Sequence, residues 1–418
     1  MPGRRRPAVP RWARGLNHRI LGLTVRNFRT LTDTKLPLGP LTVMVGPNAA
    51  GKSNVLHALE FLGGVTRKGI EPALAERGGF EALAFRGGSN PVSKISVGVE
   101  GIWSEFASEE APDSYELSVS RRRLPEPRHR EYVLSRREGF VQHPYASTAS
   151  SVELTSGAGV VHSPSETHDS TVEFRVGRMV SGLHQKQVFP FPDGSSPGKA
   201  IGEVRRFLCQ VRVFDPDVRA ARNPAAVTET RPRLKDDASN LADFLLRLQR
   251  DRDTWALLEE DIRTAVPQIR KIHTSLIPGS GLVEVELEEE RLRGRTRLAD
   301  ASWGTVRALC MLAVIHDPEP PLLTCIEEID HGLHPHVLSL LTLRLREAST
   351  RGQFLVTTHS PVLVNALEPE ELIVCERLPS GASRIPARSL EDIQRVVEKS
   401  EYEPLGDLWY SGALGGAL

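Results

Sequence analysis

The chain has 418 residues, with 39% hydrophobic and 25% charged residues and a formal net charge of +0. This composition is typical of a globular protein, and a neutral chain has no overall attraction to nucleic acid. The length exceeds what one hydrophobic core usually organises, so we expect two lobes or a domain with a large insertion.

The chain is expected to be cytoplasmic and to make no membrane contact. No apolar run approaches the roughly 18 residues that a membrane span needs. The basic start "MPGRRRPAVPRWARGLNHR" lacks the apolar centre of a signal peptide. The four cysteines, Cys209, Cys310, Cys325 and Cys375, lie within or beside apolar segments. Buried free thiols in a reducing compartment are the simplest interpretation.

The charge is nevertheless uneven. Arginine is the only charged residue type before Asp33, and residues 1–19 are expected to form a basic, disordered arm. Such an arm is either simply solvated or in contact with the phosphates of a nucleic acid. Arg121, Arg122 and Arg123 form a second basic cluster with the same two interpretations.

The predicted elements follow in chain order. Residues 20–46 read as short strands, of which "LTVMV" is buried, and apolar residues at helical spacing follow Lys52. Residues 93–180 contain period-two segments separated by Pro, Gly and Ser, which predict an antiparallel sheet. From Ile201 onward, segments such as "EVRRFLCQVRVF" and "NLADFLLRLQRD" favour helices.

Beyond residue 281 strands and helices alternate, which predicts a parallel sheet with crossover helices. We therefore expect an α/β fold. Its predicted parts are a P-loop lobe with a mixed sheet (20–65 and 281–377), a β insertion (93–180), a helical lobe (201–275) and a C-terminal tail (378–418).

Residues 46–53, "GPNAAGKS", match the phosphate-binding pattern G-x-x-x-x-G-K-[ST] between a predicted strand and a predicted helix. Its glycines let backbone amides turn toward phosphates at a helix N-terminus, whose dipole favours anions. Lys52 is expected to reach the β- and γ-phosphates of ATP, and the Ser53 hydroxyl to ligate Mg²⁺. The expected nucleotide-binding residues are Gly46, Pro47, Asn48, Ala49, Ala50, Gly51, Lys52, Ser53 and Asn54.

A P-loop needs an acid near the metal and a group that activates water. The apolar strand "PPLLTCI" ends in Glu327 and Glu328. We assign Glu327 to the metal, usually through water, and Glu328 to polarisation of the attacking water. The alternative is a pair of surface acids at the end of a strand.

His359 follows another apolar strand, "FLVTT", and Pro361 begins a helix after it. Ligands bind at the carboxyl ends of parallel strands, so this histidine could contact the γ-phosphate and sense its presence. A strand-end histidine taken alone is more often structural. With the two other motifs, the sensor role is favoured.

Together, "GPNAAGKSN", "CIEEIDHGLHP" and "TTHSP" resemble the ABC-type ATPases of the RecF, SMC and overcoming-lysogenization-defect (OLD) kind. The narrower resemblance is to predicted bacterial ATPases labelled AAA-21 or RecF-like. It also rests on "VRNFRT", "RGGFEALAFRGG", "DDASNLADFLLRL" and "LGDLWYSGALGG". It covers nearly the whole chain except the basic arm and residues 142–200.

The resemblance implies a dimer in which each P-loop faces a signature segment of the other subunit, with ATP between them. The matching segment here is 300–305, in which Ser302 and Gly304 would contact the nucleotide. In this chain Trp303 stands where a small residue is usual, and Glu327 stands where transporters have Asp. Residues 329–334 would run along the dimer interface. Three glutamines, Gln185, Gln187 and Gln210, are candidates for the loop that connects the metal to the helical lobe.

The leading functional hypothesis is an ATPase that dimerises on ATP and serves DNA maintenance or antiphage defence. In OLD proteins a nuclease (TOPRIM) domain follows the ATPase, and residues 378–418 are too few for that domain. Any cleavage is thus expected to come from a nuclease partner protein, and DNA is a candidate ligand. The alternative is a nucleotide-switched scaffold or sensor with little turnover that binds a protein partner. A zinc site built from His331, His334 and His336 is not expected.

Overall fold

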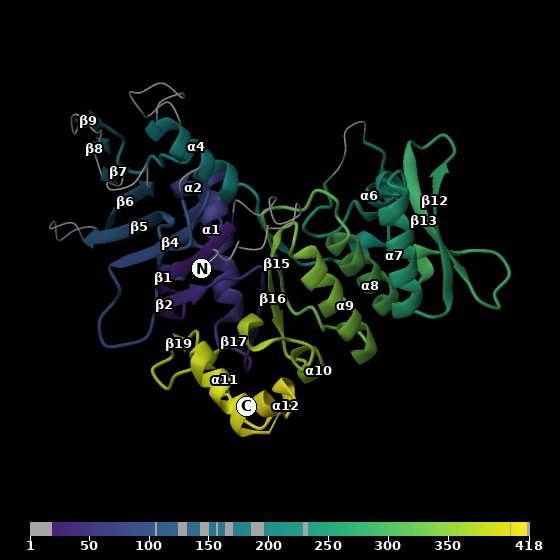
Figure 1. Ribbon diagram of the computed structural model, residues 1–418. Helices are drawn as coiled ribbons and strands as arrows, with labels where there is room; N and C mark the ends of the chain where they lie inside the picture. Colours follow the sequence, from purple (N-terminus) through teal and green to yellow (C-terminus); the bar gives the residue numbers. More distant parts are fainter. Residues whose placement is uncertain are drawn as a thin grey trace, which may run out of the picture.

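The structure is a computed structural model, and it describes residues 19–104, 107–123, 132–142, 150–155, 158–163, 170–184, 196–228, 233–401 and 403–415. The expected basic arm lies outside this part of the chain, apart from Arg19. In Figure 1 an antiparallel sheet and a helical lobe flank a central parallel sheet, and the C-terminal segment lies below them.

The central sheet carries the P-loop. Its five strands are all parallel, in the order β10-β15-β16-β3-β17. Their sequences are short apolar runs because both faces of the sheet are covered. These strands are β10 (Val211–Phe214), β15 (Leu323–Ile326), β16 (Gln353–Thr358), β3 (Leu41–Val45) and β17 (Leu372–Val374).

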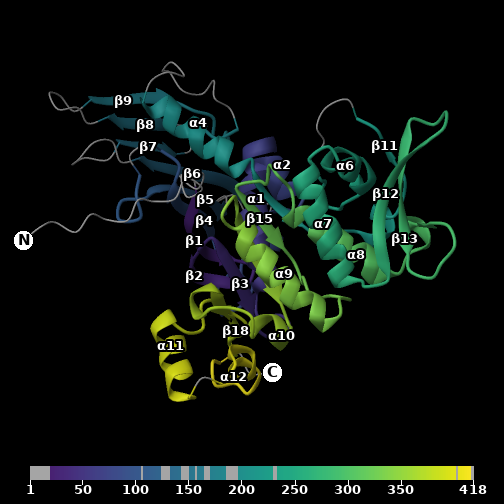
Figure 2. The same cartoon turned by 45° about the vertical axis from the view of Figure 1, so that its right-hand side comes forward.

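The antiparallel sheet predicted over 93–180 is present, but it also includes two strands assigned to the P-loop lobe. Its order is β2-β1-β4-β5-β6-β7-β8-β9. The mixed sheet expected for residues 20–65 and 281–377 is therefore wrong. The strands are β1 (Arg19–Phe28), β2 (Leu31–Pro37), β4 (Lys94–Ile102), β5 (Asp113–Arg123), β6 (Tyr132–Gln142), β7 (Ser150–Thr155), β8 (Ala158–Ser163) and β9 (Ser170–Arg175). In Figure 2 the last three strands lie far from the helical lobe.

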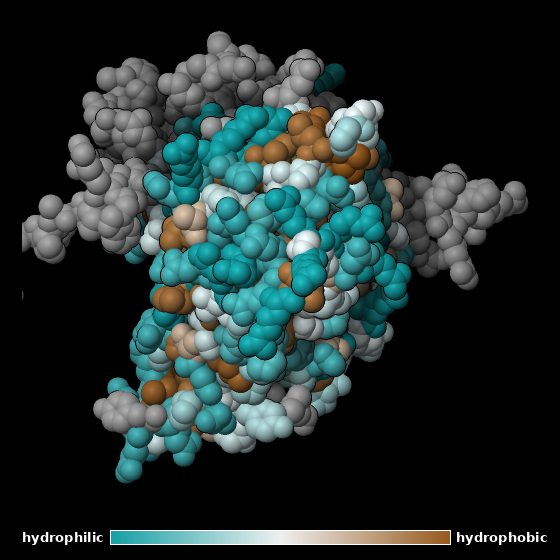
Figure 3. All heavy atoms as spheres, turned by 90° about the vertical axis from the view of Figure 1, so that its right-hand side faces the viewer, coloured by the Kyte–Doolittle hydropathy of each residue, from teal (hydrophilic) through white to brown (hydrophobic). Residues whose placement is uncertain are grey.

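The helical lobe contains α6 (Leu241–Leu248) and α7 (Arg252–Ala265), and it has its own small sheet. That sheet joins β11 (Ala225–Ala226), β13 (Leu282–Glu289), β12 (Ile269–Ile277) and β14 (Thr296–Arg297). Two predictions are corrected here. Residues 211–214, expected in a helix, form a strand of the central sheet, and β13, expected in the P-loop lobe, belongs to the helical lobe. The outer face of this lobe is mainly hydrophilic (Figure 3).

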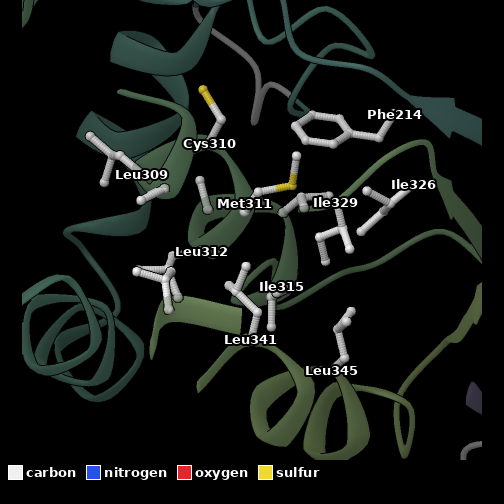
Figure 4. Packing of buried hydrophobic residues seen from close by; sticks show 14 of the residues in the cluster. Phe214, Leu309, Cys310, Met311, Leu312, Ile315, Ile326, Ile329, Leu341 and Leu345 are labelled. Atoms are coloured by element: carbon white, nitrogen blue, oxygen red, sulfur yellow. The ribbon is translucent and has the colours of Figure 1, made fainter. Parts of the chain in front are cut away.

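Helix α8 (Trp303–Ile315) is the centre of one core cluster, and every residue from Val306 to Ile315 is buried. Figure 4 shows Leu309, Met311 and Ile315 among side chains from β10, β15 and α9 (Pro335–Ala348). A helix that is apolar all round is typical of an element enclosed by others. None of the described helices is both long and apolar enough to span a bilayer.

The remaining helices cover the sheets or build the C-terminal segment. They are α1 (Lys52–Lys68), α2 (Ile70–Ala75), α3 (Gly79–Leu83), α4 (Ser196–Leu208), α5 (Val218–Ala221), α10 (Pro361–Val364), α11 (Leu390–Lys399) and α12 (Leu405–Tyr410). Short 3-10 turns occupy Leu298–Asp300 and Pro369–Glu371, and β18 (Glu376–Arg377) pairs with β19 (Ser383–Arg384). This hairpin places the segment after β17 beside the P-loop.

Candidate functional site

A cavity of about 380 Å³ opens at the carboxyl edge of the central sheet. It collects residues from the loops that follow β3, β15 and β16, because parallel strands end at the same edge. The lining residues are Thr30, Asn48, Ala49, Ala50, Gly51, Lys52, Ser53, Asn54, Glu327, Glu328, Thr357, His359 and Arg377. The three sequence motifs thus meet in one place.

The P-loop takes a backbone path that its glycines permit. Gly46, Ala49 and Gly51 have positive φ angles of 151°, 63° and 104°. A Cβ atom at Gly46 would overlap the carbonyl of Cys375, and one at Gly51 would overlap the Ser383 hydroxyl. Both positions therefore require glycine for conformation and for space.

Lys52 begins α1 and is 6% exposed. Its Nζ donates to the carbonyls of Gly46 at 2.7 Å and Pro47 at 3.1 Å. Burial lowers the pKa of this ammonium group. Within the described part of the chain, its hydrogen-bond partners are these two carbonyls, and a buried cation of this kind is suited to an anion that enters the adjoining cavity.

Glu327 and Glu328 both line the cavity, although successive strand residues normally face opposite ways. The reason is the backbone of Glu328, whose φ is 44°. Its N–H donates to Thr357 Oγ1 at 2.8 Å, and its carbonyl accepts from Arg307 Nη2 at 2.9 Å. Two side chains from β16 and α8 therefore hold a left-handed residue at the end of β15.

His359 is positioned through Asp330. The carboxylate of Asp330 accepts from Thr358 Oγ1 at 2.6 Å and from the His359 backbone N–H at 3.2 Å. Burial lowers the pKa of the His359 imidazole, and the charge of Lys52 lowers it further. Both effects favour the neutral ring, which has one N–H to donate and one nitrogen to accept.

Comparison with known proteins finds ATPase-domain family models that match parts of this chain. The AAA-21 family model, described as "AAA domain, putative AbiEii toxin, Type IV TA system", matches residues 198–365, and an "AAA ATPase domain" model matches residues 19–80. A curated relative, an OLD nuclease of Thermus scotoductus (strain ATCC 700910 / SA-01), is 58% identical over 40 residues. That match spans 10% of this chain and only 8% of the relative.

Two solved structures are similar over most of this chain. An SMC head bound to the C-winged helix domain of ScpA has 18% identity and a TM-score of 0.52, covering 90% of this chain and 99% of that one. An SMC head with an extended coiled coil, bound to the C-terminal domain of ScpA derived from Pyrococcus furiosus, has 14% identity and a TM-score of 0.52. It covers 92% of this chain and 100% of that one. The chain has the ABC-type ATPase head fold of these SMC structures.

The predicted signature segment lies at the start of α8. Ser302 caps the helix by accepting from Thr305 N at 3.1 Å, and neither Ser302 nor Gly304 lines the cavity of its own subunit. The unusual Trp303 is 39% exposed and packs on His331, with ring centroids 5.2 Å apart. Arg307 lies over the same indole at 5.4 Å. Trp303 therefore ties the signature segment to the loop after Glu328.

The glutamine expected near the metal is not found among the described residues of the cavity. Gln185 and Gln187 lie outside the described part of the chain. Gln210 precedes β10 and lines a different cavity, at the amino edge of the sheet, so this candidate is wrong. Asp215 follows β10 at the carboxyl edge instead, and its charge acts on Arg307.

The donor set of the ATPase head fits Mg²⁺ bound together with phosphates. The Ser53 hydroxyl and the Glu327 carboxylate line the same cavity, and both are hard oxygen ligands. In the described ranges there is no group of three or more His, Cys, Asp or Glu residues that could hold a metal.

Sequence reasoning missed three cavity residues. Thr357 lies inside the quoted "TTHSP" segment, so the sequence indicates that it is near the site. The sequence does not indicate that its hydroxyl contacts Glu328. Thr30 accepts from Asn54 Nδ2 at 2.7 Å and bonds the Ser383 hydroxyl at 2.7 Å. Arg377 comes from β18 and donates to the Ala49 carbonyl at 3.4 Å. Only the fold brings these last two residues to the P-loop.

Proposed function

We propose that the chain binds ATP with Mg²⁺ in this cavity and hydrolyses it to ADP and phosphate. One observation carries the proposal. The cavity brings the P-loop residues 48–54 together with Glu327, Glu328 and His359. A phosphate cradle, a metal acid, a second acid and a neutral imidazole are the groups that phosphoryl transfer to water requires.

The residues have distinct roles in this proposal. Lys52 exchanges its two carbonyl partners for the β- and γ-phosphates. Ser53 and Glu327 hold Mg²⁺, which when bound neutralises charge on the phosphates. Glu328 accepts a hydrogen bond from the attacking water and orients it. His359 donates its single N–H to the γ-phosphate, which ADP lacks.

The ATP-bound head is proposed to pair with a second copy. Ser302 is exposed at the N-terminus of α8, where the helix dipole and free amides favour an anion. Since this segment lies outside the cavity of its own subunit, a second copy can present it to the γ-phosphate. The proposed setting is cytoplasmic, in DNA maintenance or antiphage defence with a separate nuclease. The short match to an OLD nuclease supports that setting.

Nucleotide binding by Lys52→Ala tests the site. We expect ATP affinity to fall by about 100-fold or more, since buried charge-assisted bonds are lost. Lys68→Ala is the matched control, because Lys68 lies on the same helix and pairs with Glu76 on the surface. Unchanged ATP affinity in Lys52→Ala would contradict the assignment.

Steady-state hydrolysis with and without duplex DNA tests the proposed ligand. Stimulation that weakens as salt rises supports DNA phosphate contacts. Intact hydrolysis with no stimulation contradicts the DNA proposal and favours a protein partner.

A further inference from the structure

A second cavity, of about 590 Å³, lies at the opposite edge of the central sheet. Gln210, which precedes β10, and Asp317, which precedes β15, both line it. Its other wall is α6 of the helical lobe, which contributes Phe244 and Arg247. The cavity thus lies between the helical lobe and the sheet, and no role in the proposed hydrolysis involves it.

The floor of this cavity holds a buried carboxyl group, that of Asp317, with one oxygen unpaired among the described residues. Asp317 is 4% exposed, and one of its carboxylate oxygens accepts from Glu319 N at 3.0 Å. Within the described part of the chain its Oδ2 has no hydrogen-bond partner. Burial raises the pKa of this carboxyl, against the attraction of Arg212 and Arg233.

Arg212, on β10, is unsatisfied as well. It is 6% exposed, and its Nη1 donates to the Leu234 carbonyl at 2.9 Å. Its Nε and Nη2 have no hydrogen-bond partner among the described residues. A buried polar group left without a partner costs about 1–3 kcal/mol. Arg212 itself does not line the cavity, but the free acceptor of Asp317 does, and this acceptor favours a polar occupant.

The rim supplies the opposite charge. Arg233 and Arg250 are exposed where they line the cavity, and Arg247 lies 3.7 Å from the carboxylate of Asp243. Phe244, Leu248 and two prolines supply apolar wall. Asp251 and Glu319 line the cavity as well, so guanidinium groups, carboxylates and apolar side chains all contribute to its wall, with Asp317 at the floor.

These features select the chemistry of the occupant. Guanidinium groups favour a phosphate, which accepts paired hydrogen bonds from them. The free oxygen of Asp317 lies beyond the C-terminal end of α8. This oxygen and the negative end of the helix dipole both favour a hydrogen-bond donor in the occupant. A purine nucleotide carries a phosphate at one end, a flat apolar ring, and N–H donors at the other.

We propose that this second cavity is an effector site for a purine mononucleotide, with its phosphate at Arg233, Arg247 and Arg250 and its base edge at Asp317. The site is placed to influence hydrolysis, a consequence that rests on the proposed function. Asp317 follows the C-terminal end of α8, whose N-terminus carries Ser302, and precedes β15, which ends at Glu327. An occupant at Asp317 thus contacts the loop that joins the two elements.

Calorimetric titration in the Lys52→Ala background tests binding apart from the ATP site. The probes are AMP, GMP, CMP and inorganic phosphate. We expect a purine monophosphate to bind more tightly than CMP or phosphate, with affinity reduced by about tenfold in Arg233→Gln or Arg250→Gln. Asp317→Asn should change the preference between AMP and GMP. Arg263→Gln, an exposed arginine on α7, is the matched control.

Binding that is absent for all four probes, or that Arg233→Gln and Arg250→Gln leave unchanged, overturns the proposal. Equal binding of all the nucleotides and phosphate overturns the base contact at Asp317. ATP hydrolysis by the otherwise unmodified protein, with and without the bound purine nucleotide, then tests regulation. A head that binds the nucleotide but hydrolyses no ATP contradicts the proposed function and leaves the second site standing.

Discussion

Arg307 Nη2 donates to the backbone carbonyl of Glu328 at 2.9 Å, which joins the signature helix to the proposed catalytic acid within one subunit. Glu328 has a φ of 44°, and a left-handed non-glycine residue costs roughly 1–3 kcal/mol unless its surroundings hold it. Arg307 and Thr357 supply those surroundings, one on each side of the residue.

Substitution of Arg307 by lysine should lower the rate of ATP hydrolysis by about tenfold, equivalent to ~1.4 kcal/mol, while ATP binding persists. Lysine keeps the charge but cannot keep the planar contacts with both Glu328 and Trp303. Steady-state rates and equilibrium binding separate the two effects. Arg351→Lys is the control, since Arg351 also donates to a carbonyl, that of Ile315 at 3.1 Å. Equal losses in both variants would contradict the positioning role.

Gly332 is expected to resist substitution for two separable reasons. Its φ is 68°, and a Cβ atom would overlap the Trp303 indole. Gly332→Ala should lower the free energy of unfolding for both reasons. The left-handed backbone conformation costs ~1–2 kcal/mol, and the overlap with Trp303 costs about 1–3 kcal/mol. A double-mutant cycle with Trp303→Ala should recover only the second part. Strictly additive losses would show that the overlap is relieved in another way.

The lowered pKa of His359 makes a prediction about pH. Because the folded state favours the neutral ring, the stability that this histidine contributes is present above its unfolded pKa of about 6.5 and is lost as the pH falls through the lower folded value. Without nucleotide, the protein should therefore lose stability relative to His359→Gln as the pH falls below about 6.5. Denaturant unfolding of both proteins measures the difference. A gap that stays constant with pH would contradict the pKa shift.

Arg377 should strengthen nucleotide binding from outside the P-loop. It lines the ATP cavity and an adjoining cavity of about 540 Å³ that also contains Arg29 and Phe85. Arg377→Gln should weaken ATP binding by about threefold to tenfold, and less at high salt, because the side chain is exposed and screened. Arg384→Gln is the control on the same hairpin, where Arg384 lies 3.9 Å from Glu376. If both substitutions weakened ATP binding equally, the effect of Arg377 would come from the general positive charge of the hairpin and not from a contact in the cavity.

The parts of the candidate site are local patterns in the sequence, and the structure brings them to one cavity. The P-loop, the Glu327–Glu328 pair and His359 each follow an apolar run, and parallel strands bring such ends together. What a pattern cannot give is a contact through space. Nothing near Arg307 indicates that its guanidinium reaches Glu328, and nothing near Arg377 indicates that β18 folds back beside the P-loop.

Strand partners were the least predictable feature of the fold. β1 and β3 are close in sequence and both apolar, yet β1 pairs with β4 and β3 pairs with β16. The residues of β10 continue the apolar spacing of α4, so the pattern alone favoured one long helix there. Tertiary pairing with β15 decides the outcome.

The most direct test of ATP hydrolysis at this site compares the turnover of Glu328→Gln with that of the unmodified protein. The molecular mass of each protein is measured in the presence of ATP. The amide keeps the shape of the side chain but is a poor acceptor for the water proton. We predict that turnover falls by about 100-fold or more, while ATP stays bound and the protein accumulates as a dimer. Glu376→Gln, a change in the C-terminal hairpin, should alter neither property. Turnover that Glu328→Gln leaves unchanged would contradict the central claim that this site hydrolyses ATP.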